Sequence, residues 1–183
     1  MRKTIILAGA AAVLLAGVQT AQADDWGAYG RDLAGTRFSP LTQVTAANVA
    51  GLKPAWTFHT GDISTGQVKG GGPRSGFETT PLVIDGKMYL TTPFNRVIAL
   101  DATSGKQLWA FDPRLDRAQP YGDGLINRGI AAWRDPAAGK GKACALTLFE
   151  ATLDARLVAV DAATGAPCPG FGTNGQVPLS DVA

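Results

Sequence analysis

The sequence predicts an all-β chain whose short antiparallel strands form the N-terminal blades of a β-propeller, in a ring that these residues do not close. Glycine and proline, 23 and 11 of the 183 residues, are scattered between short apolar runs, which is typical of many short strands. One stretch of about thirty residues has the pattern of a four-stranded meander, the size of a single blade. Part of this stretch recurs later in the chain.

Four strands are expected between Pro81 and Phe111. Asp85-Gly86 lies between two apolar runs and predicts a tight hairpin, because the turn requires positive φ at both central residues. A third apolar run, Val97 to Leu100, is followed by a turn and then by a strand that carries Trp109. A lone four-stranded sheet exposes both faces, so this blade requires neighbours stacked on it.

An internal repeat predicts one such neighbour. The run from Val97 to Gly105 recurs as Leu157 to Gly165, and two further strands, 130–133 and 145–150, precede the second copy. Closed propellers have about 4 to 8 blades, so two blades cannot form a ring. We therefore expect the sequence to be truncated from a longer protein, with assembly of several short copies as the alternative.

A short helix and an isolated strand are expected upstream of the meander. The Thr45 hydroxyl is placed to accept a hydrogen bond from a free backbone N–H at the start of a helix from Ala46 to Leu52. Residues Ala55 to Thr60 alternate as in a strand, which we expect to be the outer strand of a blade completed elsewhere in a longer chain.

Residues 1–23 have the features of a signal peptide. Met1-Arg2-Lys3 is basic, an apolar stretch follows from Ile5 to Val18, and Ala21-Gln22-Ala23 is a cleavage site of small residues. The apolar stretch is shorter than the roughly 18 residues that a membrane-spanning helix needs. We therefore expect a periplasmic mature chain, residues 24–183, that forms one partial propeller domain.

The charge and cysteine content limit the partners and suggest one crosslink. Removal of Arg2 and Lys3 leaves equal numbers of basic and acidic residues. Nucleic acids and acidic membrane surfaces bind clustered Lys and Arg, so we expect neither as a partner. An oxidising compartment favours a disulfide between the only two cysteines, Cys144 and Cys168, with two separate buried thiols as the alternative.

The common catalytic and metal motifs are missing from the sequence. The sole histidine, His59, has no Cys or His at ligand spacing, and the glycine run 70–72 lacks the ending of a phosphate-binding loop. Polar residues at strand edges remain, and loops that a rigid scaffold presents there can converge on one ligand. These residues are Glu78, Arg128 and Thr152.

Several segments resemble the quinoprotein dehydrogenases that use pyrroloquinoline quinone (PQQ). Ala99-x-Asp101 followed by Gly105-Lys106-x-x-Trp109 is similar to the tryptophan-docking repeat of that family, in which the indole packs between neighbouring blades. In the second copy Ala166-Pro167-Cys168 replaces this ending, so the docking contact is missing or is remade by the cysteine. The other similar segments are Asp25–Arg31, Gly35–Leu41, Leu52–Asp62, Phe77–Leu82, Leu90–Asp101 and Asn127–Gly129.

The resemblance implies that Glu78, Arg128 and Thr152 contact PQQ and that the quinone carries the redox chemistry. It also implies a calcium ion and a general-base aspartate, supplied by later blades beyond Ala183. The whole protein would be a periplasmic PQQ- and calcium-dependent dehydrogenase that oxidises an alcohol, sugar or polyol and passes electrons to a quinone or cytochrome. The present chain alone is expected to be inactive.

Two positions bear on the substrate. Gly122-Asp123-Gly124 occupies the region in which methanol- and ethanol-oxidising members carry adjacent cysteines, so the glucose, quinate and shikimate branch is the closer match. Phe94 stands where that branch is expected to carry histidine, which argues against glucose. The alternatives are a non-catalytic propeller-repeat envelope scaffold and an inactive truncated remnant, because a fold does not fix a function.

Overall fold

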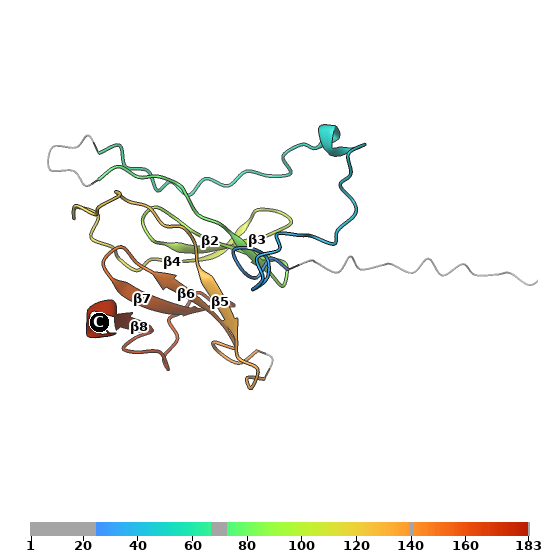
Figure 1. The fold of residues 1–183 in the computed structure, drawn as a ribbon. Helices are drawn as coiled ribbons and strands as arrows, with labels where there is room; N and C mark the ends of the chain where they lie inside the picture. The colour runs from blue at the N-terminus through green and yellow to red at the C-terminus, as the bar shows by residue number, and fades with distance from the viewer. Residues whose placement is uncertain (1–24, 67–72, 140, 183) are drawn as a thin grey trace, which may run out of the picture.

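The computed structural model describes residues 25–66, 73–139 and 141–182, so the predicted signal peptide lies outside the described residues. The described residues form two four-stranded antiparallel sheets, which lie next to each other in Figure 1. This arrangement confirms the predicted succession of blades in a ring that stays open. Within the described part of the chain, no helix has the length and apolarity needed to cross a bilayer.

The first sheet confirms the predicted meander, because its strands follow one another in chain order. Asp85 and Gly86 both have positive φ, 51° and 72°, as a tight hairpin requires. Ile84 therefore pairs directly with Lys87 across the turn. The strands are β1 (Leu82–Ile84), β2 (Lys87–Thr91), β3 (Val97–Asp101) and β4 (Gln107–Phe111).

The second sheet repeats this order, but its last strand was not predicted. At the position that corresponds to the start of β4, Pro167 makes only an isolated bridge to Val160. Because proline has no N–H for a ladder of hydrogen bonds, the chain loops outward before it pairs again. The strands are β5 (Ala131–Arg134), β6 (Leu146–Ala151), β7 (Arg156–Asp161) and β8 (Gln176–Pro178).

The core lies between the two sheets and draws on both. The hydroxyl of Tyr89 donates a hydrogen bond to the carbonyl of Ala162, just after β7 in the second blade, 3.1 Å away. Burial, together with the charges of Asp85 and Asp161, raises the pKa of Tyr89 to about 12, so the phenol keeps its proton. Each fully buried aliphatic side chain contributes about 1.5–3 kcal/mol. The buried members are Leu82, Ile84, Tyr89, Val97, Ala99, Leu148, Val158, Val160 and Ala162.

Tryptophan side chains close the seams between successive parts of the chain. The indole N–H of Trp109, on β4, donates to the carbonyl of Ala162 in the second blade at 3.2 Å. Trp56 makes the equivalent bond, also 3.2 Å long, to Ala102 of the first blade. The packing between blades predicted for Trp109 is therefore confirmed, and Trp56 extends the pattern upstream.

The upstream segment differs from the prediction at the expected helix. The expected helix from Ala46 to Leu52 is only a 3-10 turn, η1 (Val49–Gly51), because its apolar residues Val49 and Leu52 are exposed among the described residues and add no packing energy. The Thr45 hydroxyl does not cap it; instead the backbone N–H of Thr45 donates to Asn48 Oδ1 at 2.7 Å. Residues 55–60 pair with no strand in the described chain, and Trp56 and Phe58 pack on a small apolar cluster of the first blade.

The two cysteines are bonded to each other, with Cα atoms 5.9 Å apart. Cys144 precedes β6, and Cys168 lies in the outward loop before β8. The bond therefore anchors this loop at the place where the first blade carries its tryptophan-bearing strand.

Candidate functional site

A cavity of about 650 Å³ lies where the chain enters β1 and β5 and where it leaves β6, and we call it the entry cavity. Its volume is within the range of about 300–1,000 Å³ that is usual for small-molecule sites. Arg128 and Thr152 line it together, although they come from different connections of the second blade. The lining residues are Tyr29, Thr80, Leu82, Gly122, Asp123, Ile126, Asn127, Arg128, Gly129, Ile130, Ala151, Thr152 and Leu153.

Two segments that lead into β1 and β5 run in parallel and bring Glu78 and Arg128 together. The N–H of Thr80 donates to the carbonyl of Arg128 at 3.1 Å, and Thr80 forms a parallel bridge with Gly129. Gly129 has φ 131°, and a β-carbon there would lie 2.9 Å from the carbonyl oxygen of Thr80. Only glycine permits this close approach of the two backbones.

Glu78 and Arg128 form an ion pair at the edge of the entry cavity. Arg128 Nε lies 3.3 Å from Glu78 Oε2, and the side chains are 69% and 47% exposed, respectively. An exposed pair of this kind contributes only about 0–1 kcal/mol to stability. The guanidinium therefore keeps donors available for a ligand, while the backbone on both sides of it is fixed.

Thr152 is buried and starts the turn between β6 and β7. Its hydroxyl donates to Asp154 Oδ1 at 2.6 Å, and the hydroxyl oxygen of Thr152 accepts from the backbone N–H of Arg156 at 3.2 Å. The hydroxyl has a second acceptor in the carbonyl of Arg156 at 3.1 Å, so its proton is already engaged within the turn. A ligand in the entry cavity would meet the oxygen of Thr152 or would have to draw its proton away from these acceptors.

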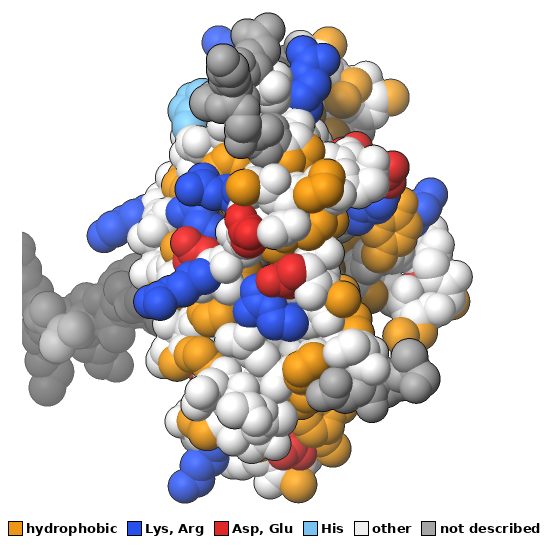
Figure 2. Space-filling view, turned by 90° about the vertical axis from the view of Figure 1, so that its left-hand side faces the viewer, with side chains coloured by type: hydrophobic (Ala, Val, Ile, Leu, Met, Phe, Trp, Pro, Cys, Tyr) orange, Lys and Arg blue, Asp and Glu red, His pale blue; other side chains and the backbone are white. Residues whose placement is uncertain are grey.

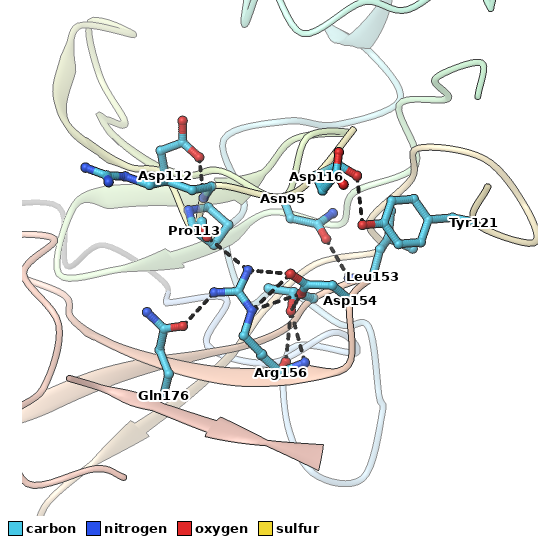
Figure 3. A network of polar contacts seen from close by, with 11 residues as sticks. Asn95, Asp112, Pro113, Asp116, Tyr121, Leu153, Asp154, Arg156 and Gln176 are labelled. Carbon is cyan, nitrogen blue, oxygen red and sulfur yellow. Dashed lines mark hydrogen bonds and ion pairs between the residues drawn. The ribbon is translucent and has the colours of Figure 1, made fainter. Parts of the chain in front are cut away.

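Arg156 lies at the centre of the polar network that holds this turn (Figure 3). Its Nη2 lies 2.6 Å from Asp154 Oδ2 and 2.9 Å from the carbonyl of Pro113, and its Nη1 donates to Gln176 at 2.6 Å. Partial burial raises the pKa of Asp154, but the hydrogen bonds from Arg156 and Thr152 outweigh this effect and hold the pKa below its ordinary value.

Asn95 lies in the turn between β2 and β3, the counterpart in the first blade of the β6–β7 turn, and joins it to the second blade. This fully buried residue accepts from the N–H of Leu153 at 2.7 Å and donates to the carbonyl of Ile126 at 3.2 Å. Both partners line the entry cavity. Asn95 therefore connects the two walls of the cavity through main-chain atoms.

Glu150 and Asn127 form a buried pair beneath Arg128. Glu150 is 1% exposed, and its Oε1 accepts from Asn127 Nδ2 at 3.0 Å. Sequence reasoning overlooked both residues as well as Asn95. The signal for Glu150 was present, since it is the one acidic residue in the otherwise apolar and neutral strand from Leu146 to Ala151.

The residues that bear on the substrate are divided between two cavities. Gly122 and Asp123 line the entry cavity. Phe94 instead lines a second cavity of about 420 Å³, where the guanidinium of Arg117 lies over its ring, 4.6 Å from the centroid.

Figure 2 shows basic and acidic side chains close together across the middle of one face of the molecule. The described residues contain no group of three or more His, Cys, Asp or Glu that could hold a metal ion.

Two stacked four-stranded blades, with a cavity at the entry to their first strands, define part of a β-propeller. Residues 26–183 match the family described as "PQQ: Glucose/ethanol/alcohol dehydrogenase, beta-propeller domain". The chain therefore belongs to this PQQ β-propeller family.

Known relatives agree with this assignment. The chain is 37% identical to quinoprotein glucose dehydrogenase A of Acinetobacter calcoaceticus over 89% of its own length and 22% of that protein. It is 38% identical to the quinate/shikimate dehydrogenase (quinone) of Acinetobacter baylyi over 86% and 20%, respectively. The crystal structure of quinohemoprotein alcohol dehydrogenase from Comamonas testosteroni matches with a TM-score of 0.59 and 36% identity, over 78% of this chain and 18% of that one. The chain thus spans about a fifth of the length of these relatives.

Proposed function

We propose that the longer protein to which this chain belongs is a periplasmic PQQ- and calcium-dependent dehydrogenase that oxidises an alcohol, sugar or polyol. Its electrons would pass to a quinone or a cytochrome. Residues 24–183 would form the first blades of the propeller, and later blades would supply the calcium ligands and the general base. PQQ, when bound, supplies the two-electron oxidation of the substrate.

The observation that carries the proposal is the position of Arg128 at the entry cavity. Its backbone is held by Thr80 and Gly129, whereas its side chain is mostly exposed and paired only weakly with Glu78. PQQ carries three carboxylates and two quinone oxygens, and a guanidinium offers them charge-assisted hydrogen bonds in a fixed geometry. Glu78 would orient this guanidinium and accept from the ring N–H of the cofactor. Thr152 would add a neutral contact from the opposite wall.

The test uses the full-length exported protein, reconstituted with PQQ and calcium and assayed with alcohols, sugars and polyols in the presence of an artificial electron acceptor. Arg128→Ala should weaken PQQ binding by about tenfold or more, since one charge-assisted hydrogen bond is worth about 1.5–3 kcal/mol. Arg134→Ala is the matched control, because Arg134 forms an exposed ion pair with Asp85 at 2.7 Å and does not line the entry cavity.

The outcome separates the dehydrogenase from the alternatives. Cofactor-dependent oxidation that falls in Arg128→Ala and not in Arg134→Ala supports the proposal. A full-length protein that folds and neither binds PQQ nor oxidises any of these substrates would instead be a non-catalytic scaffold or an inactive remnant.

A further inference from the structure

Glu150 is an acidic residue in a place that favours an apolar one. Its side chain lies on the face of β6 that also carries Leu148, and Val158 of β7 pairs opposite it. At 1% exposure it has lost its contact with water. A buried carboxylate is unfavourable unless it is paired with a cation or fully hydrogen-bonded, so a specific role has to offset the cost of retaining it.

The surroundings of Glu150 suit a neutral acid better than a carboxylate. Its Oε2 is buried without a hydrogen-bond partner among the described residues. The charged groups that act on it, Arg156 and Asp154, have opposite signs and are bonded to each other. Burial therefore dominates and raises the pKa of Glu150 well above its ordinary value, although Arg156 lowers it and Asp154 raises it further.

Among the described residues, the carboxyl of Glu150 has one hydrogen-bond partner, Asn127, and this residue holds both segments of the entry cavity that carry predicted ligand residues. Asn127 Nδ2, which donates to Glu150, also donates to the carbonyl of Ala151 at 3.3 Å. Its Oδ1 accepts from the N–H of Gly129 at 2.9 Å. The Asn127 side chain thus spans Arg128 on one side and contacts the residue before Thr152 on the other.

We propose that Glu150 is a positioning residue of the entry cavity, which orients Asn127 as a neutral carboxylic acid and thereby sets the backbone at Arg128 and Thr152. This inference rests on the proposed function, because it concerns the placement of the predicted PQQ contacts. Ionisation of Glu150 would put a buried charge without its own counter-ion beside Asn127. The arrangement of Arg128 and Thr152 that binds the cofactor would therefore be lost as pH rises.

The experiment measures PQQ affinity as a function of pH in the calcium-loaded full-length protein, by titration of the change in protein fluorescence. The wild type should bind more weakly as pH rises through the raised pKa of Glu150. Glu150→Gln should keep its affinity across the same range, since an amide oxygen can accept the bond from Asn127 and carries no charge. Glu150→Leu should bind about tenfold more weakly at every pH, the loss expected for one hydrogen bond.

Each outcome bears on a different claim. If wild type and Glu150→Gln bind PQQ with the same affinity and the same pH profile, the positioning role is wrong while the proposed function stands. If the wild type binds no PQQ at any pH, the proposed function fails and the inference fails with it. If Glu150→Leu does not fold, the comparison of wild type with Glu150→Gln decides alone.

Discussion

A β-carbon on Gly165 would lie 2.5 Å from Cε3 of the Trp109 indole, so the ring fills the space that a side chain at position 165 would need. The same relationship recurs one blade earlier between Gly105 and Trp56, again at 2.5 Å from Cε3. Both glycines also have positive φ, 75° and 69°. The seams are therefore closed by an indole lying against a bare backbone.

Gly165→Ala should destabilise the protein by about 2–4 kcal/mol, because it adds overpacking against the indole to the strain of positive φ. Gly86→Ala provides the control, since Gly86 has a similar φ of 72° and open space around it. That variant should lose only about 1 kcal/mol. Urea unfolding followed by tryptophan fluorescence would measure both. Equal losses would show that the contact with Trp109 adds nothing.

Replacement of both cysteines by serine should lower stability by about 3 kcal/mol, the value expected for a loop of this length. PQQ affinity should not change, because Cys144 precedes β6 whereas Thr152 follows the end of that strand. Thermal unfolding with and without reductant, alongside a PQQ titration, would check both statements. If the double serine variant binds PQQ more weakly than the wild type with its disulfide intact, the disulfide acts on the cavity through β6.

Asn95→Ala should lower stability by about 2–3 kcal/mol and weaken PQQ binding, because the partly buried N–H of Leu153 and the buried carbonyl of Ile126 lose their partner. Asn174→Ala is a matched control. Asn174 has a similar left-handed φ, 53° against 57°, and is exposed. Chemical unfolding and a cofactor titration would separate the two variants. Equal behaviour would assign the effect to backbone strain alone.

The stability of the wild type relative to Glu150→Gln should fall as pH rises. The folded-state pKa of Glu150 is raised above the ordinary value of 4.5, so the folded protein holds this proton more tightly than the unfolded chain. Its contribution is fully present below about pH 4.5 and is lost as pH increases through the raised pKa. Denaturant midpoints of the two proteins between pH 4 and pH 9 would reveal the difference. Parallel pH profiles would contradict it.

Local patterns were sufficient to predict the strands from β1 to β7, because alternation, the Asp85-Gly86 turn and the internal repeat are all encoded within short stretches of sequence. The outer strand β8 escaped prediction, since Pro167 displaces it along the chain. The segment from Ala55 to Thr60 has the alternation of a strand, yet its residues pack through Trp56 and Phe58 and find no strand to pair with in the described chain. Periodicity reports which side chains are buried and does not identify the pairing partner.

The site could be predicted only in part, for a related reason. Glu78, Arg128 and Thr152 stand at strand edges, and the structure brings Arg128 and Thr152 to one cavity with Glu78 beside them. Their role toward PQQ stays a prediction. Asn95 and Glu150 act through partners that are 58 and 23 residues away. No local pattern specifies such partners.

The seam has a consequence for how the blades can diverge. Trp109 and Trp56 bond to main-chain oxygens, those of Ala162 and Ala102, and every residue type provides such an oxygen. The side chain of the residue whose carbonyl accepts the bond is therefore free to change, provided that it stays small. The residue that donates the bond cannot change in this way, because only a tryptophan side chain has both a ring wide enough to cover the glycine and an N–H to donate. At the two seams formed by Trp56 and Trp109, successive parts of the chain can thus lose nearly all of their sequence likeness while the tryptophan and the glycine beneath it keep them in contact.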